Sequence, residues 1–361
     1  MGEMALRILQ INTERGWRGG ERQTLLTAVG LRARGHDVEL LLRKGSVLAE
    51  RARALGLVVH AAGGGFSFGC WLALHGKRYD VLHAQTAKVV AWAVAVAPAY
   101  RRPLVFSRRT SFPVGAGGWL TRLKWRRLDQ MVAISEAAAQ APRALGVSTL
   151  VIPSAVLPIA ADATRIQHFL KYRALEGKRL IGTAAALSVE KDPVTLIYAA
   201  AKVCAQFEDV VFLHWGAAGS ASFAAQQAIA ELGLQDRYLL LGFEPEVEQL
   251  FAPLSVFVMA SRYEALGSSV LDAMLQNVPV VSTDAGGLKE TVCAGRGLVC
   301  APGDAATMAA HIVWMLAQPE QAQAMAKVAC AAVRAEYAVD GMVERYLKVY
   351  RKVLDTQGPG P

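Results

Sequence analysis

Glu264 and Asp272 stand eight positions apart in a segment whose residue types suit chemistry on a ligand. An apolar run precedes them, and Gly267 and two serines lie between them, so the pattern predicts a strand, a loop and a helix. Gly267 lets the backbone approach a ligand closely. Ser268 or Ser269 suits the cap of a helix whose first N–H groups attract phosphate or a sugar hydroxyl. Both acids would then point into a cleft at the carboxyl ends of parallel strands; a capped core helix with two solvated acids is the alternative.

The elements that must position these acids alternate regularly along the chain. Short β-branched or leucine-rich runs are separated by amphipathic stretches, which predicts parallel strands joined by helices that cover both faces of a sheet. The rhythm restarts after a proline-bounded segment at 153–158, and 361 residues suit two domains. We therefore predict an α/β protein with two doubly wound parallel sheets. The expected strands are 6–11, 38–42, 57–60, 81–83, 104–106, 131–134, 150–152, 180–184, 210–214, 238–241, 256–259 and 278–282.

Basic charge is concentrated in the first part of the chain. Residues 1–150 hold 22 Lys and Arg against 9 Asp and Glu, whereas residues 151–361 hold 17 against 21. The resulting net charges of +13 and −4 indicate that the first part meets something anionic, either nucleic acid or a phosphate-bearing lipid surface. Ordinary solvated side chains are the alternative.

Composition indicates a cytoplasmic protein without a membrane-spanning helix. The longest apolar stretch, Val89–Pro98, is about half the length that such a helix needs. The N-terminus lacks the basic and apolar regions of a signal peptide. The five cysteines are far apart and form no C-x-x-C pair, so neither a disulfide framework nor a zinc site is indicated. We expect no cofactor.

The segment Ser261–Met274 resembles the E-x7-E region of the family 4 retaining glycosyltransferases. The resemblance extends over nearly the whole chain. Short matches are weak one at a time, but eight occur in the family's order and at suitable spacing. They are the glycine loop 18–21, Arg34–Val38 (similar to "R-G-H-x-V"), 79–83, 132–135, the hinge 151–153, 187–192, 241–243 and 283–290.

The resemblance implies a GT-B fold, in which two Rossmann-like doubly wound domains face a cleft. Residues 1–155 would form the acceptor-binding domain and residues 156–340 the nucleotide-sugar-binding domain. Residues 341–361 would form a C-terminal helix and tail, for which packing back on the N-terminal domain is one placement.

The resemblance also implies roles for single residues. Glu264 would contact the transferred sugar, Lys191 the diphosphate and Asp272 the ribose hydroxyls. An ammonium and preorganised amides aimed at a diphosphate stabilise it as it leaves, so a metal is unnecessary, and the sequence has no D-x-D motif to hold one. The other donor-binding candidates are the backbone of Ala265, Leu266, Gly267 and Ser268, the phosphate-binding Gly19 and Gly20, and the loop residues Gly216 and Gly242.

The sequence departs from the family pattern at three places. Ala186 stands where an Arg is usual, Asp272 where Glu is usual, and Arg109 where many relatives have a histidine. Arg108 or Arg109 is a candidate for the missing phosphate-binding cation, and Arg109 suits a substrate with phosphate or carboxylate; a plain surface arginine is the alternative. His83 ends a strand and is a candidate either for lining the cleft or for a structural position.

The run Trp119–Arg127 places two tryptophans and four cations in one helical window. This composition is typical of a helix at an anionic membrane interface, and an ordinary amphipathic surface helix is the alternative. Together with the basic first part, it predicts peripheral binding to the inner face of the cytoplasmic membrane and an anionic glycan or glycolipid acceptor.

The predicted function is retaining, metal-independent transfer of a sugar from a nucleotide-sugar, with UDP as the expected nucleotide, to a cell-envelope acceptor such as lipopolysaccharide core. The alternative is a GT-B nucleotide-sugar epimerase or hydrolase without a glycan acceptor. An NAD-dependent dehydrogenase is disfavoured because Gly16–Gly20 does not supply G-x-G-x-x-G. A nucleic-acid-binding protein is disfavoured because no helix-turn-helix, RNP-like or OB-like pattern occurs.

Overall fold

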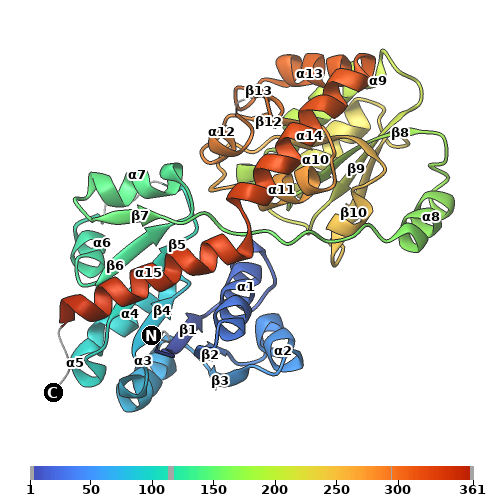
Figure 1. Cartoon of the computed structure of the whole chain (residues 1–361). Helices are drawn as coiled ribbons and strands as arrows, with labels where there is room; N and C mark the ends of the chain where they lie inside the picture. The colour runs from blue at the N-terminus through green and yellow to red at the C-terminus, as the bar shows by residue number, and fades with distance from the viewer. Residues whose placement is uncertain (1–3, 113–117, 294, 358–361) are drawn as a thin grey trace. The chain divides into compact units, whose positions relative to one another are not determined.

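The computed structural model describes residues 4–112, 118–293 and 295–357. The chain divides into two compact units: unit 1 comprises Met1–Ala155 and Tyr337–Pro361, and unit 2 comprises Val156–Glu336. The C-terminal segment of unit 1 thus begins at Tyr337, slightly before the position 341 expected from the sequence. Each unit is an α/β domain with its own parallel sheet (Figure 1).

Unit 1 is built on a seven-stranded parallel sheet in the order β3-β2-β1-β4-β5-β6-β7. The strands are β1 (Arg7–Asn12), β2 (Asp37–Arg43), β3 (Val58–Ala62), β4 (Val81–Ala84), β5 (Leu104–Arg108), β6 (Gln130–Ala133) and β7 (Thr149–Val151). The helices are α1 (Gly19–Ala33), α2 (Val47–Ala54), α3 (Gly65–His75), α4 (Ala87–Ala95), α5 (Ala97–Tyr100), α6 (Gly118–Trp125), α7 (Glu136–Ala144) and α15 (Val339–Gln357), with the 3-10 turn η1 (Gly76–Arg78).

Neighbouring side chains on the strands of unit 1 point into two separate apolar layers. Leu40 and Leu42 pack with α1, α2 and α15, whereas Leu41 packs in the layer that contains α3, α4 and Trp125 of α6. This explains why the strands are apolar along their whole length, as expected for a parallel sheet that is covered on both faces. Figure 1 shows α15, in red, lying among the blue and cyan elements of this unit.

Unit 2 has a six-stranded parallel sheet in the order β10-β9-β8-β11-β12-β13. Its strands are β8 (Arg179–Ala184), β9 (Val210–Trp215), β10 (Tyr238–Gly242), β11 (Leu254–Met259), β12 (Val280–Thr283) and β13 (Leu298–Cys300). Its helices are α8 (Ala163–Tyr172), α9 (Pro193–Cys204), α10 (Ser222–Glu231), α11 (Ser268–Leu275), α12 (Leu288–Thr291), α13 (Ala305–Ala317) and α14 (Pro319–Glu336), with the 3-10 turns η2 (Val189–Lys191) and η3 (Val247–Leu250). Residues of α9, α10 and α13 form the core on one face.

All twelve runs expected as strands form strands, with ends shifted by one or two residues. The sequence did not predict β13, which has only three residues and lies at the edge of its sheet. In the described part of the chain, none of the helices combines the length and the apolar character needed to cross a bilayer.

Candidate active site

The loops after β8 and β11, neighbouring strands of unit 2, bring two of the predicted residues together. Lys191 Nζ donates to Glu264 Oε2, and the two side chains keep 25% and 14% of their surface exposed. Ser261 Oγ lies 3.5 Å from the same carboxylate oxygen, and Ala265 N–H donates to Glu264 Oε1 over 3.2 Å. The strand order reverses between these strands, and such switch points are where open α/β sheets bind ligands. An ammonium and an oriented carboxylate therefore meet at the expected binding edge.

A second ion pair fixes the two loops against each other. Arg262 N–H donates to Glu190 O over 2.8 Å, and Arg262 Nε donates to Asp192 Oδ2 over 2.6 Å. Asp192 also caps α9 by accepting from the backbone and the hydroxyl of Thr195. Because Lys191 lies between Glu190 and Asp192, its backbone is held on both sides. The sequence analysis did not single out Arg262; its position two residues before Glu264 was the available signal.

Two glycines let backbone segments approach one another beside this pair. A Cβ on Gly216 would lie 1.8 Å from Ala185 O, and a Cβ on Gly287 would lie 2.1 Å from Ala265 O. Gly287 N–H also donates to the backbone oxygen of Glu264 over 2.9 Å. Any side chain at either position would push the loop away, so the site depends on backbone packing.

Helix α11 begins directly after the Glu264 loop. Gly267 precedes it with φ +84°, a conformation that favours glycine, and a Cβ there would lie 2.5 Å from Leu288 Cδ2. Gly267 is the N-cap residue and forms no side-chain cap hydrogen bond, so the expected cap by Ser268 or Ser269 is wrong. The first N–H groups of α11 nevertheless lie close to Glu264 in the chain. Asp272 lies one turn further on and is 7% exposed; its contact with a ribose remains a prediction. Ala265 and Leu266 are also buried.

His214 supports the neighbouring loop from within the core. Its ring nitrogens lie 2.8 Å from Tyr238 Oη and 2.9 Å from Ala185 O. A carbonyl only accepts, so Nε2 carries the proton and Nδ1 accepts from the tyrosine. Burial lowers the pKa of His214 to about 4, which keeps the ring neutral. At the same sheet edge Gly216 N–H donates to Gly242 O over 2.7 Å, so the two predicted glycines lie together.

In unit 1 the predicted glycine loop lies beside Arg109. Helix α1 begins at Gly19, and a Cβ on Gly20 would lie 3.7 Å from Arg109 Cδ. Arg109 NH1 donates to Ser154 Oγ over 3.0 Å, and NH2 donates to Gln85 Oε1. Both acceptors are neutral, so the guanidinium brings positive charge to the N-terminus of α1, where the helix dipole also favours an anion.

The structure corrects the prediction for His83 as a cleft residue. His83 has no exposed surface, and its ring nitrogens lie 2.7 Å from Tyr350 Oη and 2.8 Å from Ser107 Oγ. Ser107 Oγ in turn lies 2.8 Å from Tyr346 Oη of α15. Burial holds the pKa of His83 well below its usual value. His83 is therefore a core residue that ties β4 to α15.

Arg108 is also a structural residue rather than a free phosphate-binding cation. Its Nε donates to Thr110 O over 2.9 Å, another guanidinium nitrogen donates to Phe112 O, and the group lies 5.1 Å from the ring of Trp125. Of the two neighbouring arginines, only Arg109 faces the glycine loop. Trp125 is buried in the apolar layer of unit 1, so it does not serve the expected membrane surface.

Two family models together match most of the chain. The model described as Glycosyltransferase Family 4 matches residues 17–157, and the model described as Glycosyl transferases group 1 matches residues 165–330. The chain belongs to the family 4, group 1 glycosyltransferases. The first match covers β2 to β7 of unit 1, and the second covers β8 to β13 of unit 2.

The solved structures show the same fold. This glycosyltransferase superposes on the crystal structure of Anabaena HepE in complex with UDP and glucose with a TM-score of 0.85, at 20% identity, over 96% of this chain and all of that one. The fold is GT-B.

Curated relatives include two enzymes with different acceptors. The 2-deoxystreptamine glucosyltransferase of Streptomyces kanamyceticus is 32% identical over 56% of this chain, but the match spans only 54% of that relative. The lipopolysaccharide core biosynthesis mannosyltransferase LpcC of Rhizobium leguminosarum bv. viciae is 25% identical over 79% of this chain and 82% of the relative.

Unit 1 of the glycosyltransferase also contains a cavity that the sequence analysis missed. It has a volume of about 330 Å³ and lies where β1, β2 and β4 end. Lys88 pairs with Glu14 over 3.0 Å, and the described residues show no ion pair for Arg15 or Arg43. The indole of Trp92 closes over Gly65, whose Cβ would lie 2.2 Å from the indole nitrogen. The cations are scattered in sequence, so only the parallel sheet brings them together.

Proposed function

We propose that this glycosyltransferase moves a sugar from a nucleoside diphosphate sugar to an anionic glycan or glycolipid, with retention of anomeric configuration and without a metal. The observation that carries the proposal is the Lys191–Glu264 pair at the switch point of unit 2. A diphosphate leaving group gains negative charge as the anomeric C–O bond breaks. Lys191 and the N–H groups at the start of α11 are the matching positive groups.

The bond changes proposed for the transfer involve only the two substrates. The acceptor oxygen bonds to the anomeric carbon on the face from which the diphosphate departs, and the acceptor proton passes to the departing phosphate oxygen. Glu264 is oriented by Ala265 N–H to stabilise positive charge on the sugar, and it is the rival nucleophile if a covalent intermediate forms. We expect activity to survive EDTA and the product to keep the donor's configuration; an inverted product or a strict Mn²⁺ requirement would contradict the proposal.

UDP is the proposed nucleotide of the donor. Support comes from the solved relatives, since Anabaena HepE has been crystallised with UDP and with UDP-glucose. Thermal-shift measurements with UDP, GDP, ADP and CMP test this: UDP should raise the unfolding temperature most, because a ligand that binds only the folded state stabilises it. No shift with any of the four nucleotides would end the transferase proposal.

The cavity in unit 1 favours an anionic acceptor. Arg15, Arg43 and Lys88 outnumber the single acid Glu14 among its lining residues, and Trp92 offers an aromatic face on which a sugar ring can lie. An aminocyclitol such as 2-deoxystreptamine is cationic at neutral pH and would be repelled there. A glycan with phosphate or carboxylate, as in lipopolysaccharide core, fits the charge.

An assay with donor alone separates this proposal from an epimerase or hydrolase, which would consume the donor at the same rate without an acceptor.

We also propose that the enzyme works at the inner face of the cytoplasmic membrane, with α6 as a contact. Trp119, Leu120 and Leu123 are all more than half exposed, and Arg122 is exposed beside them. Apolar and cationic groups exposed on one helix suit an anionic interface. Replacing Arg122, Lys124, Arg126 and Arg127 with glutamine should abolish co-sedimentation with anionic liposomes and leave the UDP thermal shift unchanged. Equal sedimentation of the variant would remove the role of α6.

A further inference from the structure

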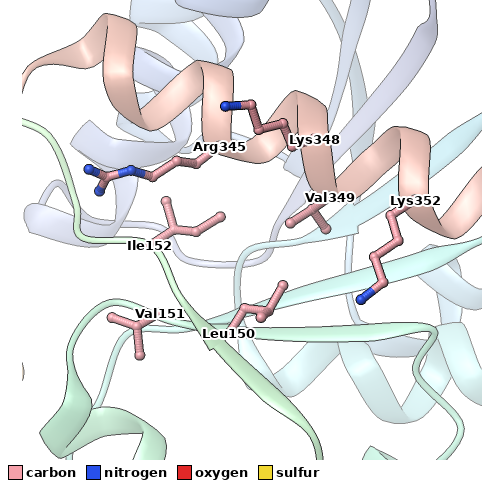
Figure 2. A pocket seen from close by; sticks show the side chains of 7 residues that line it. All are labelled: Leu150, Val151, Ile152, Arg345, Lys348, Val349 and Lys352. Atoms are coloured by element: carbon pink, nitrogen blue, oxygen red, sulfur yellow. The ribbon is translucent and has the colours of Figure 1, made fainter.

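A second cavity of unit 1 lies away from the predicted donor and acceptor residues, between edge strand β7 and helix α15. Its volume is about 240 Å³, and it is lined by Leu150, Val151, Ile152, Arg345, Lys348, Val349 and Lys352. Figure 2 shows Arg345 and Lys352 on either side of the apolar residues Leu150, Ile152 and Val349. The cavity is smaller than the roughly 300–1,000 Å³ of ordinary ligand pockets, so it suits part of a molecule rather than a whole nucleotide-sugar.

The floor of this groove includes a leucine of the edge strand β7 that the helices leave partly exposed. Residues of α1, α2 and α15 cover this face of the central strands, whereas Leu150 on the edge strand β7 is 38% exposed. Ile152 and Val349 are almost fully buried and continue the apolar surface inward. A parallel sheet normally has both faces covered, so the partly exposed Leu150 is an apolar position left uncovered at the edge of this sheet.

The rim of the groove is cationic. Arg345, Lys348 and Lys352 follow one another at helical spacing on α15, so they share the face that carries Val349. Lys348 pairs with Glu344 over 2.7 Å, and in the described parts of the chain no ion pair is recorded for Arg345 or Lys352. Among the described residues, Arg345 therefore has only an electrostatic interaction with its neighbour Glu344, and Lys352 has no recorded ion pair.

We propose that this groove binds the anionic end of a membrane phospholipid, with the phosphate at Lys352, the first methylenes of an acyl chain on Leu150 and Val349, and Arg345 adding longer-range attraction from the other end of the groove. Charge complementarity selects the anion, and the apolar floor selects an amphiphile over free phosphate, because inorganic phosphate would bury none of that surface. The choice of occupant rests on the proposed work at a membrane.

The position of the groove agrees with that of α6. Guanidinium nitrogens of Arg122 and Arg126 lie within 4 Å of where a Cβ on Gly146 would be, and Gly146 closely precedes β7. Helix α6 and the groove thus lie near the same edge of the sheet of unit 1. A lipid in the groove would add a specific contact to the general attraction of the basic helix.

Titration with dihexanoyl phosphatidylglycerol below its micelle concentration, followed by calorimetry, tests the proposal on the full chain. Wild-type protein should bind this lipid and not dihexanoyl phosphatidylcholine. The double variant Arg345→Gln/Lys352→Gln should bind about tenfold more weakly, since each cation contributes to attraction of an anionic lipid. The matched control Arg32→Gln/Arg53→Gln removes two exposed charges from α1 and α2 and should bind like wild type.

A second variant separates lipid from simple anion. Leu150→Asn should weaken phosphatidylglycerol binding by about threefold through loss of the apolar floor and leave glycerol 3-phosphate binding unchanged. Equal lipid binding by wild type and the Arg345/Lys352 variant would overturn the proposal and assign these side chains to covering Leu150 with their stems. Equal binding of glycerol 3-phosphate and the lipid would also overturn it.

Failure of the lipid proposal and failure of the proposed function give different results in these experiments. The UDP thermal shift reports the donor site without lipid, and the α6 variant reports vesicle attachment. If the wild-type protein fails to bind the lipid while the UDP thermal shift and the vesicle attachment are both as expected, only the groove proposal is wrong. Absence of a nucleotide response, with lipid binding lost in the Arg345/Lys352 variant, would defeat the transferase proposal alone.

Discussion

The binding edges of the two sheets are constructed differently. In unit 2, Lys191 and Arg262 each face a carboxylate, and Gly216 and Gly287 bring the loops into backbone contact. In unit 1, the cavity at the strand ends is lined by long cationic side chains, of which only Lys88 has a recorded ion pair among the described residues. One edge is held together by close backbone packing, and the other is lined by long cationic side chains.

The difference bears on the two tasks proposed for the units, which are stabilising the leaving group in unit 2 and recognising the acceptor in unit 1. Stabilising a leaving group requires dipoles and charges that are already in place, because reorganising them during the reaction costs free energy. Recognising a bulky anionic acceptor tolerates side chains that adapt. The long cations of unit 1 lose rotamer entropy on binding, so their net contribution per contact is smaller.

The largest expected effect is at the paired carboxylate of unit 2. Glu264→Gln removes the charge proposed to lie next to the reacting sugar and should lower kcat/KM by about 10²- to 10³-fold, as for loss of one preorganised electrostatic contact. Lys191→Ala should act similarly through the leaving group. Because the two side chains form one pair, the double variant should lose less than the product of the single losses.

Glu208→Gln is the matched control for this series, because Glu208 is exposed in the same unit and lies outside the site. It should retain wild-type kcat/KM. Wild-type activity in Glu264→Gln would show that the binding edge of unit 2 is not where the chemistry occurs.

The second prediction is that both units lose stability as the pH falls, because each contains a buried histidine. His214 has an ordinary pKa near 6.5 when unfolded and about 4 when folded, so as pH falls between these values only the unfolded chain takes up a proton. The free energy of unfolding is therefore highest above about pH 6.5, and it should drop by up to about 3 kcal/mol as the pH approaches 4.

Chemical denaturation at pH 7 and pH 5 checks this. His214→Gln should show a smaller pH dependence than wild type, and His83→Gln should do the same for unit 1, since burial lowers the pKa of His83 too. An unchanged pH dependence in both variants would mean that neither ring is neutral and buried in solution.

The third prediction tests the backbone packing of unit 2. Gly287→Ala places a Cβ against Ala265 O, and overpacking of this kind costs about 1–3 kcal/mol. We expect a lower unfolding temperature and a weaker UDP response, because the Glu264 loop must move. Gly341→Ala, which meets no atom within 4 Å, is the control and should do neither. A normal UDP response in Gly287→Ala would show that the close approach is dispensable.

The smallest effect is expected at the cation-lined cavity of unit 1. Arg43→Gln should raise KM for an anionic acceptor by about fivefold, in line with about 1 kcal/mol for a partly exposed charge contact, and leave kcat for donor hydrolysis unchanged. Lys88→Gln should do less, because Lys88 is already paired with Glu14. A larger rise in KM from Lys88→Gln than from Arg43→Gln would show that Lys88, and not Arg43, is the cation that contacts the acceptor.

The strand pattern and the strand, loop and helix around Glu264 could be predicted because local sequence carries them. Apolar runs fix the strands of a buried parallel sheet, and Glu264, Gly267 and Ser268 occupy one loop and helix start. Lys191 was named through the family resemblance, and the structure brings it to Glu264. Even the short strand β7 was visible as an apolar run.

The remaining features depend on contacts between distant segments. Arg108 and Arg109 are adjacent in sequence, and only the fold shows that one binds loop carbonyls while the other faces Gly20. His83 was ambiguous because its partner Tyr350 is 267 residues away. Arg15 and Arg43 have no common sequence signature, since parallel strands bring them together only after folding.

The placement of α15 sets an order for folding during synthesis. The chain leaves unit 1 at Ala155, completes unit 2, and returns at Tyr337. Tyr346 and Tyr350 then fill the layer that already contains Ile8 and Leu40 and bond to Ser107 and His83. Unit 2 is contiguous and can fold as the ribosome releases it, whereas the apolar layer of unit 1 stays open until residues 337–357 emerge. The half of the enzyme that is made first is thus the half that finishes folding last, with one of its apolar layers uncovered in the interval.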